Sequence, residues 1–448
     1  MLDAPETPIL RRVLMLAIPA LAQQYTFFFI QQYDQYLARH FSAQHQAALT
    51  TANYLYWFVS SYSVVVSAGA VALVGRLYGA KDFALANRAA GQALILAAFF
   101  GFCATIAAAF GLSTLLSALQ LPPGTPEIAG EYLAPLLLIL TLQMIETGGI
   151  ACLIGAGDTR TGLFVLLGVA TVNVPVAWLL SGGGGPELDF GFTGIAMGTA
   201  SAHFLGGLTV MALLMRGRSG LKVSFAFLKP NPMLIYRLLR VSVPAAFDSL
   251  SVAVCQLVFL SLVNKLGNEA AAAHGIALRW EGLAYLGGNA FGSAAMAVVS
   301  QNLGAQRPDR AAKGAWVTLA LCGSLMTFMG VLFYVFAEPM CALYSPDEPA
   351  VTAQAVIALK LIAFAMPALA SVTIFTSCCR AAGDTRVLVF ITWFGFLGVR
   401  LPLAMYLTQG EGSLGLQGAW NAMVADIGVR GGLLLVRFAR GKWKKVVV

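Results

Sequence analysis

Apolar stretches long enough to cross a lipid bilayer recur along this chain, and they constrain its fold more than any other feature. A transmembrane helix needs roughly 20 mainly apolar residues. Hydrophobic residues make up 58% of the 448 residues and charged residues only 11%, with a mean hydropathy of +0.77. This pattern predicts an all-α integral membrane protein with twelve transmembrane helices. We expect the helices at residues 9–38, 46–74, 89–119, 129–153, 161–181, 191–215, 234–264, 271–300, 314–337, 351–377, 387–408 and 414–436.

A membrane β-barrel and a cleaved leader are poorer interpretations of these stretches. Barrel strands alternate apolar and polar residues, and runs such as residues 64–74 do not alternate. The apolar run after Arg11 and Arg12 contains Asp34 and lacks a convincing small-residue cleavage site, so we expect a first helix and no signal peptide.

The basic residues gather at one set of connections between the predicted helices. They lie at the chain start, after every second helix and at the chain end, whereas the opposite connections hold only Arg39 and Lys265. Because Lys and Arg mark the cytoplasmic side, we expect both termini in the cytoplasm. Topology and anionic lipid headgroups account for the net charge of +8, so nucleic acid is not an expected partner.

The two halves of the chain repeat each other. Pro19-Ala20 recurs as Pro244-Ala245, 225 residues later, and residues 156–160 (AGDTR) recur as residues 382–386. Six helices per half predict two six-helix bundles related by a pseudo-twofold axis along the membrane normal, as in transporters that place the solute between the halves. The expected organisation is an N-terminal lobe at residues 1–215, a cytoplasmic linker at 216–232 and a C-terminal lobe at 233–448.

These features resemble the multidrug and toxic compound extrusion (MATE) family, in its bacterial form, and this resemblance implies a location in the bacterial inner membrane. The resemblance covers essentially the full length and rests on a Pro followed by an acid in the first helix, Gly79-Ala80 after the second, and the turn at residues 155–160, which is echoed at 380–386. In that turn Gly155 and Gly157 are expected to end a helix, and Asp158 to cap the next one.

Asp34 is the leading candidate for chemistry, because an ionisable residue at membrane depth is costly and marks function by default. The alternative is a carboxylate that merely caps the end of its helix. The resemblance implies that Asp34 couples transport to a cation, with Asn173 and Thr199 as its partners. A buried carboxylate takes a proton, and one ringed by neutral oxygens holds Na⁺, so either ion is open. The family's second acid is replaced here by Ala177.

Polar and aromatic side chains elsewhere in the predicted helices are candidates for binding substrate, although ion pairing or packing is the alternative for each. Gln31 and Tyr33 share the first helix with Asp34, and Gln31 aligns with Gln256 in the repeat. Asp426 and Arg430, spaced i, i+4, are expected to pair with each other. The remaining candidates are Asp248, Glu281 and Lys360.

The function these features favour is a cation-coupled antiporter, driven by H⁺ or Na⁺, which exports organic, cationic or amphipathic compounds by alternating access. The alternative is a flippase for a lipid-linked anionic substrate, which Arg279, Lys360 and Arg400 would suit if they are unpaired. No nucleophile, acid pair or metal-ligand spacing supports an enzyme. We expect no cofactor apart from the coupling ion, small organic molecules and membrane lipids as partners, and a functional monomer.

Overall fold

The helices of this chain follow the predicted apolar stretches closely. The computed structural model describes residues 7–118, 124–409, 413–446 and 448. Within these residues every regular element is a helix, apart from one isolated β-bridge between Arg218 and Leu221. The prediction of an all-α membrane protein with two six-helix bundles is confirmed. The first half contains α1 (Ile9–Ala38), α2 (Ala43–Gly79), α3 (Phe83–Ala118), α4 (Thr125–Leu138), α5 (Leu140–Gly155), α6 (Thr159–Trp178) with the π-helical η1 (Leu179–Gly183), and α7 (Gly191–Arg216).

The second half repeats this order after the short 3₁₀ helices η2 (Pro186–Leu188) and η3 (Phe225–Leu228). The eleventh predicted span is one continuous helix that becomes π-helical at its centre, where η4 separates α13 from α14. The elements are α8 (Pro232–Asn264), α9 (Asn268–Gly304), α10 (Pro308–Val335), α11 (Ala337–Ala342), α12 (Pro349–Ala382), α13 (Arg386–Trp393), η4 (Phe394–Arg400), α14 (Leu401–Thr408), α15 (Gly415–Ala439) and η5 (Lys442–Lys445).

Most of these helices are apolar enough to span a membrane. In the described residues ten pass that test, or eleven if α4 and α5, which meet at a bend of 54°, form one span. The helix α15, which carries Asp426 and Arg430, is outside this set. Large apolar side chains remain exposed on the helix surfaces, such as Phe110 on α3, which is 83% exposed. An apolar outer surface of this kind is suited to lipid, and the chain is a multi-pass membrane protein.

The chain folds into two compact units whose boundaries lie just before the repeated prolines. Unit 1 contains Met1–Ala17 and Val243–Val448, and unit 2 contains Ile18–Ser242. The helices α1 and α8, which begin the two sequence repeats, therefore each belong to both units and change unit beside Pro19 and Pro244. Because proline removes a helical hydrogen bond, each helix lacks one backbone hydrogen bond near the residue where it changes unit.

In unit 2 the beginning of α8 packs on α2. The Gly69 amide donates to Ser242 Oγ at 2.8 Å. A Cβ atom on Gly69 would lie 2.4 Å from that oxygen and 2.5 Å from the Leu238 carbonyl oxygen. The glycine therefore lets the two helices approach at a distance that no larger residue permits.

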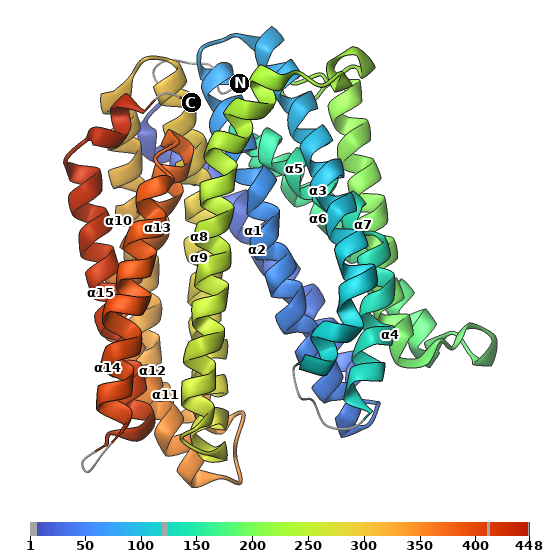
Figure 1. Ribbon diagram of the computed structural model, residues 1–448, viewed down its shortest axis with the longest axis vertical. Helices are drawn as coiled ribbons and strands as arrows, with labels where there is room; N and C mark the ends of the chain where they lie inside the picture. Colours follow the sequence, from blue (N-terminus) through green and yellow to red (C-terminus); the bar gives the residue numbers. More distant parts are fainter. Residues whose placement is uncertain (1–6, 119–123, 410–412, 447) are drawn as a thin grey trace. The chain divides into compact units, whose positions relative to one another are not determined.

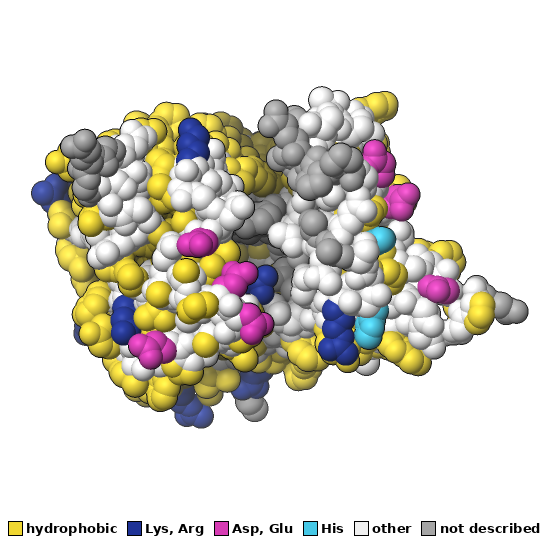
Figure 2. All heavy atoms as spheres, turned by 90° about the horizontal axis from the view of Figure 1, so that it is seen from below, with side chains coloured by type: hydrophobic (Ala, Val, Ile, Leu, Met, Phe, Trp, Pro, Cys, Tyr) yellow, Lys and Arg dark blue, Asp and Glu magenta, His cyan; other side chains and the backbone are white. Residues whose placement is uncertain are grey.

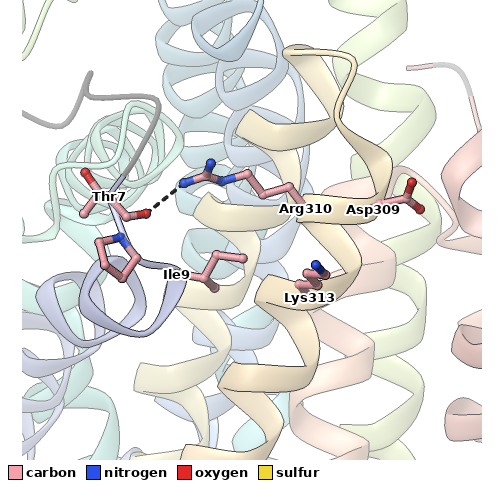
Figure 3. A pocket seen from close by; sticks show the side chains of 6 residues that line it. Thr7, Ile9, Asp309, Arg310 and Lys313 are labelled. Carbon is pink, nitrogen blue, oxygen red and sulfur yellow. Dashed lines mark hydrogen bonds between the residues drawn. The ribbon is translucent and has the colours of Figure 1, made fainter.

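In unit 1 the two ends of the described chain meet at the start of α10. The Arg310 guanidinium donates to the Thr7 carbonyl at 2.8 Å, beside a pocket of about 360 Å³ that Lys313 also lines (Figure 3). Lys444 Nζ lies 2.9 Å from Asp309. Both termini thus lie at the same end of this unit (Figure 1), as an even number of spans requires. Figure 2 gives the view from below, in which both acidic and basic side chains are exposed.

The turn between α5 and α6 has the predicted structure. Gly157 adopts a positive φ of 83°, and Asp158 caps α6 by accepting the Thr161 amide at 2.9 Å. Burial acts to raise the pKa of Asp158, but hydrogen bonds from Ser219 and Thr161 and the charge of Arg218 outweigh it and hold the pKa below its ordinary value. The equivalent Asp384 instead pairs with Arg437 at 2.9 and 3.0 Å.

Substituting Gly69→Ala tests the close packing of α2 on α8. We expect a lower melting temperature of the purified protein, with a cost of about 1–3 kcal/mol, because the new methyl group overpacks the contact with Ser242 and Leu238. Gly111→Ala in α3 is the matched control, since its Cβ meets no atom within 4 Å. Equal melting temperatures for the two variants would contradict the packing described.

Candidate functional site

The carboxylate of Asp34 lies in unit 2, four residues before the end of α1. It is only 7% exposed, although a carboxylate in a membrane span is costly to bury. Its observed hydrogen-bond partner comes from another helix, so Asp34 does more than cap its own helix end.

The three residues predicted to act together are in contact. Thr199 Oγ of α7 donates to Asp34 Oδ2 at 2.8 Å and accepts from Asn173 Nδ2 of α6 at 2.9 Å. All three side chains are buried. One hydroxyl therefore links the acid of α1 to the amide of α6.

Close packing of α6 on α7 positions this hydroxyl. A Cβ atom on Gly198 would lie 2.5 Å from both Cα and Cβ of Ala177, so glycine allows the helices to touch one residue before Thr199. Ala177, where the resembled family has a second acid, contributes this contact and brings no charge.

Two oxygen atoms around the Thr199 hydroxyl are buried without a partner. In the part of unit 2 that the structure describes, neither Asp34 Oδ1 nor Asn173 Oδ1 accepts a hydrogen bond. Leaving a buried polar atom unsatisfied costs about 1–3 kcal/mol. A proton on Asp34, or a Na⁺ ion between these oxygens, would satisfy them, so the residues fit either predicted ion.

A second buried acid contacts α7 one helical turn after Thr199. Glu146 Oε2 of α5 lies 2.9 Å from His203 Nδ1 of α7, and the two residues are 4% and 5% exposed. Glu146 and His203 are 57 residues apart, and no motif in the sequence connects them. The spacing of Thr199 and His203, i and i+4 on one helix, was the available signal.

Metal and thiol chemistry find no further support in the described residues. No group of three or more His, Cys, Asp or Glu side chains there is arranged to hold a metal ion. The seven cysteines are free, and six of them are buried, as expected for small packing residues.

In unit 1 the predicted substrate residue Asp248 is hydrogen-bonded by two residues of the same unit. Arg380 donates to its carboxylate at 3.0 Å and Thr392 Oγ donates at 2.6 Å. Asp248 is 2% exposed. These contacts favour the ion-pair interpretation of this acid.

Asp426, which is fully buried in unit 1, binds two arginines. The predicted i, i+4 pair with Arg430 is confirmed, with two hydrogen bonds of 2.8 Å. Arg400 also binds Asp426, at 2.7 and 2.9 Å, and donates to Gln256 Oε1 at 2.9 Å. A Cβ atom on Gly395 would lie 2.2 Å from Asp426 Oδ1, so the π-helical segment η4 leaves room for this carboxylate.

The remaining predicted substrate residues are described by their contacts within each unit. Glu281 of α9 interacts electrostatically with Arg400 and Arg430, yet its buried Oε2 accepts no hydrogen bond from the described residues. Lys360 Nζ lies 5.7 Å from the centre of the Tyr334 ring. In unit 2, Tyr33 stacks on Phe29 and Tyr36, and Gln31 is half-buried.

Comparison with known families agrees with this arrangement of two repeated bundles. The model of the MatE family matches twice, at residues 19–179 and 244–406, and both matches begin at the repeated prolines. The chain belongs to the MATE family. The two matches also confirm the internal duplication on which the prediction of two bundles rests.

Several individual proteins resemble the chain over nearly its whole length. A probable multidrug resistance protein NorM from Thermotoga maritima is 26% identical over 455 residues, covering all of this chain and 96% of its own. An FAD transporter from Shewanella oneidensis is 24% identical and covers 91% of this chain and 90% of its own. A solved structure of a multidrug resistance MATE family transporter in an outward-facing conformation shares the fold, with a TM-score of 0.91, 17% identity and 98% of both chains covered.

Substituting Asp426→Asn tests whether the ion pairs of Asp426 with Arg400 and Arg430 stabilise this MATE fold. We expect destabilisation by about 3 kcal/mol or more, seen as a lower melting temperature and poorer yield, because two buried arginines lose their counter-ion. Asp347→Asn, at an exposed acid of the same unit, is the control. If Asp426→Asn has the same melting temperature as the control, the ion pairs of Asp426 with Arg400 and Arg430 do not stabilise the fold.

Proposed function

We propose that this MATE protein is a cation-coupled antiporter that exports organic, cationic or amphipathic compounds by alternating access. The observation that carries the proposal is the buried Asp34 carboxylate, which is hydrogen-bonded by the neutral Thr199 and has one oxygen unpartnered. The proposed setting is a bacterial inner membrane with both termini in the cytoplasm. The protein acts as a monomer and needs no cofactor besides the coupling ion.

The proposed mechanism uses the difference in cost between a charged and a neutral Asp34. Burying an ionised carboxylate in a membrane span costs free energy. A bound H⁺ or Na⁺ lowers this cost because it neutralises the charge of Asp34. The conformations that expose the site to opposite sides of the membrane then differ in cation affinity, so a cation gradient shifts their populations. Coupling follows if bound substrate and bound cation favour different conformations.

The contacts of the basic residues support a cationic or amphipathic cargo over a lipid-linked anionic one. Of the three bases that would suit phosphate, Arg400 is paired with Asp426 at 2.7 Å. Arg279 and Lys360 lie over the rings of Tyr344 and Tyr334, at 5.2 and 5.7 Å from their centres. The name of the Shewanella relative nevertheless makes FAD the anion to test.

Counterflow in proteoliposomes tests the coupling. With ethidium as the organic cation, we expect an imposed pH or Na⁺ gradient to accelerate its movement. Asp34→Asn should reduce this acceleration at least about tenfold, the effect of roughly 1.4 kcal/mol. Asp347→Asn should transport like the unchanged protein. Normal gradient-driven transport by Asp34→Asn would refute the coupling role, and failure of both gradients would refute the antiporter.

The same vesicles test the cargo. We expect unlabelled organic cations to compete with ethidium, and FAD to neither compete nor be transported. Gradient-driven movement of FAD without movement of ethidium would overturn the proposed substrate class while leaving the coupling intact.

A further inference from the structure

The pocket at the start of α10 combines two cationic side chains with an apolar wall. Its volume of about 360 Å³ falls within the range of roughly 300–1,000 Å³ that is typical of small-molecule sites. Arg310 and Lys313 are spaced i, i+3 and therefore lie on one face of α10. Ile9, at the start of α1, and the preceding Pro8 add apolar atoms (Figure 3). All of these residues belong to unit 1.

The one acid among these lining residues is already paired. Asp309 points away from Thr7 (Figure 3) and lies 2.9 Å from Lys444 Nζ. The bond from Arg310 goes to the neutral Thr7 carbonyl and does not cancel the charge of the guanidinium. In the part of unit 1 that the structure describes, Lys313 forms no ion pair within 4 Å. With Lys444 included, three basic side chains face one acid here.

The end of the described chain fixes Lys444 at the edge of this pocket. Trp443 is completely buried, and its ring stacks on Phe438 with 4.5 Å between the centres. The Trp443 indole N–H also donates to the Phe438 carbonyl at 2.9 Å. The neighbouring Lys442 and Lys445 are exposed. Basic side chains at the end of a membrane-spanning bundle attract anionic lipid headgroups.

An apolar surface continues from the pocket along α10. Trp316 lies one turn after Lys313 on the same face and is 41% exposed. Its ring is fixed by edge contacts with Phe375 and Phe438, at 5.3 and 5.8 Å between the centres. One turn further on, Ala320 is also exposed. Tryptophan is enriched where headgroups meet hydrocarbon, so the order cation, tryptophan, apolar surface matches the phosphate, ester and acyl parts of a phospholipid.

We propose that this pocket binds the phosphate group of an anionic phospholipid, with an acyl chain lying along Trp316. Charge complementarity selects an anionic lipid, because the ammonium group of a zwitterionic headgroup is repelled by Arg310 and Lys313. Since the pocket joins α10 to the start of α1, a lipid bound there stabilises the packing of these two segments. The site does not include Asp34, and it does not depend on the proposed coupling.

Melting temperatures of the purified full-length protein in a neutral detergent test this site. The protein is titrated with phosphatidylglycerol and, separately, with phosphatidylcholine of the same acyl chains. We expect only phosphatidylglycerol to raise the melting temperature, because a ligand that binds the folded state stabilises it. Lys313→Gln should raise the half-saturating concentration about fivefold, as expected for the loss of one basic contact with an anionic lipid.

The controls separate a specific pocket from a general effect of charge. Lys442→Gln removes the same charge from an exposed lysine outside the pocket lining and should titrate like the unchanged protein. Lys313→Arg keeps the charge and should retain the lipid effect. Lys313 is exposed, so the melting temperature without lipid should be the same in all of these variants.

Quenching of tryptophan fluorescence by brominated phosphatidylglycerol locates the bound lipid. We expect Trp316→Phe to remove the part of the quenching that Lys313→Gln weakens. Quenching that depends on Lys313 but not on Trp316 would overturn the proposed position of the acyl chain.

Three results would overturn the lipid site itself. One is equal stabilisation by the two lipids, and another is equal weakening in Lys313→Gln and Lys442→Gln, which would mean that charge acts over the whole surface. The third concerns inorganic phosphate: stabilisation by phosphate but not by phosphatidylglycerol, with the same dependence on Lys313, would assign the pocket to a soluble phosphate compound.

Discussion

The cost of a charge inside the hydrocarbon layer is the constraint on which the rest of this structure depends. Most buried charges in the described part of the chain meet it by pairing, as Asp248 does with Arg380 and Asp426 with two arginines. Asp34 differs, because its hydrogen bond comes from a neutral hydroxyl and one of its oxygens has no partner. Glu281 also keeps an unpartnered oxygen, but two arginines act on it. This exception in unit 2 is the acid that we propose binds the coupling cation.

Much of the fold could be predicted from the sequence, because a membrane restricts the chain to long apolar helices whose signals are local. All twelve predicted spans correspond to helices or to bent and π-interrupted helix pairs. The repeated prolines fixed the equivalence of the halves, and the family model matches from those same residues. The cap at Asp158 and the Asp426–Arg430 pair were predictable too, since each lies within a few residues of sequence.

What escaped prediction depends on contacts between distant segments. Glu146 and His203 are 57 residues apart and meet only because glycines of α7 admit α5. Arg400 joins Asp426 through a π-helical segment that no local pattern indicated. The change of unit within α1 and α8 follows from how the beginning of each helix packs. For Asp34, Asn173 and Thr199, family resemblance supplied the grouping, and the structure supplied the contacts that explain it.

Charge displacement measured on a supported membrane tests the central claim most directly, because it detects cation binding at Asp34 without any organic substrate. Purified protein in liposomes would be given a sudden step in pH or in Na⁺ concentration. The account predicts a transient current for one of these cations, and its loss in Asp34→Asn. A current that persists unchanged in Asp34→Asn, or no current with either cation, would contradict it.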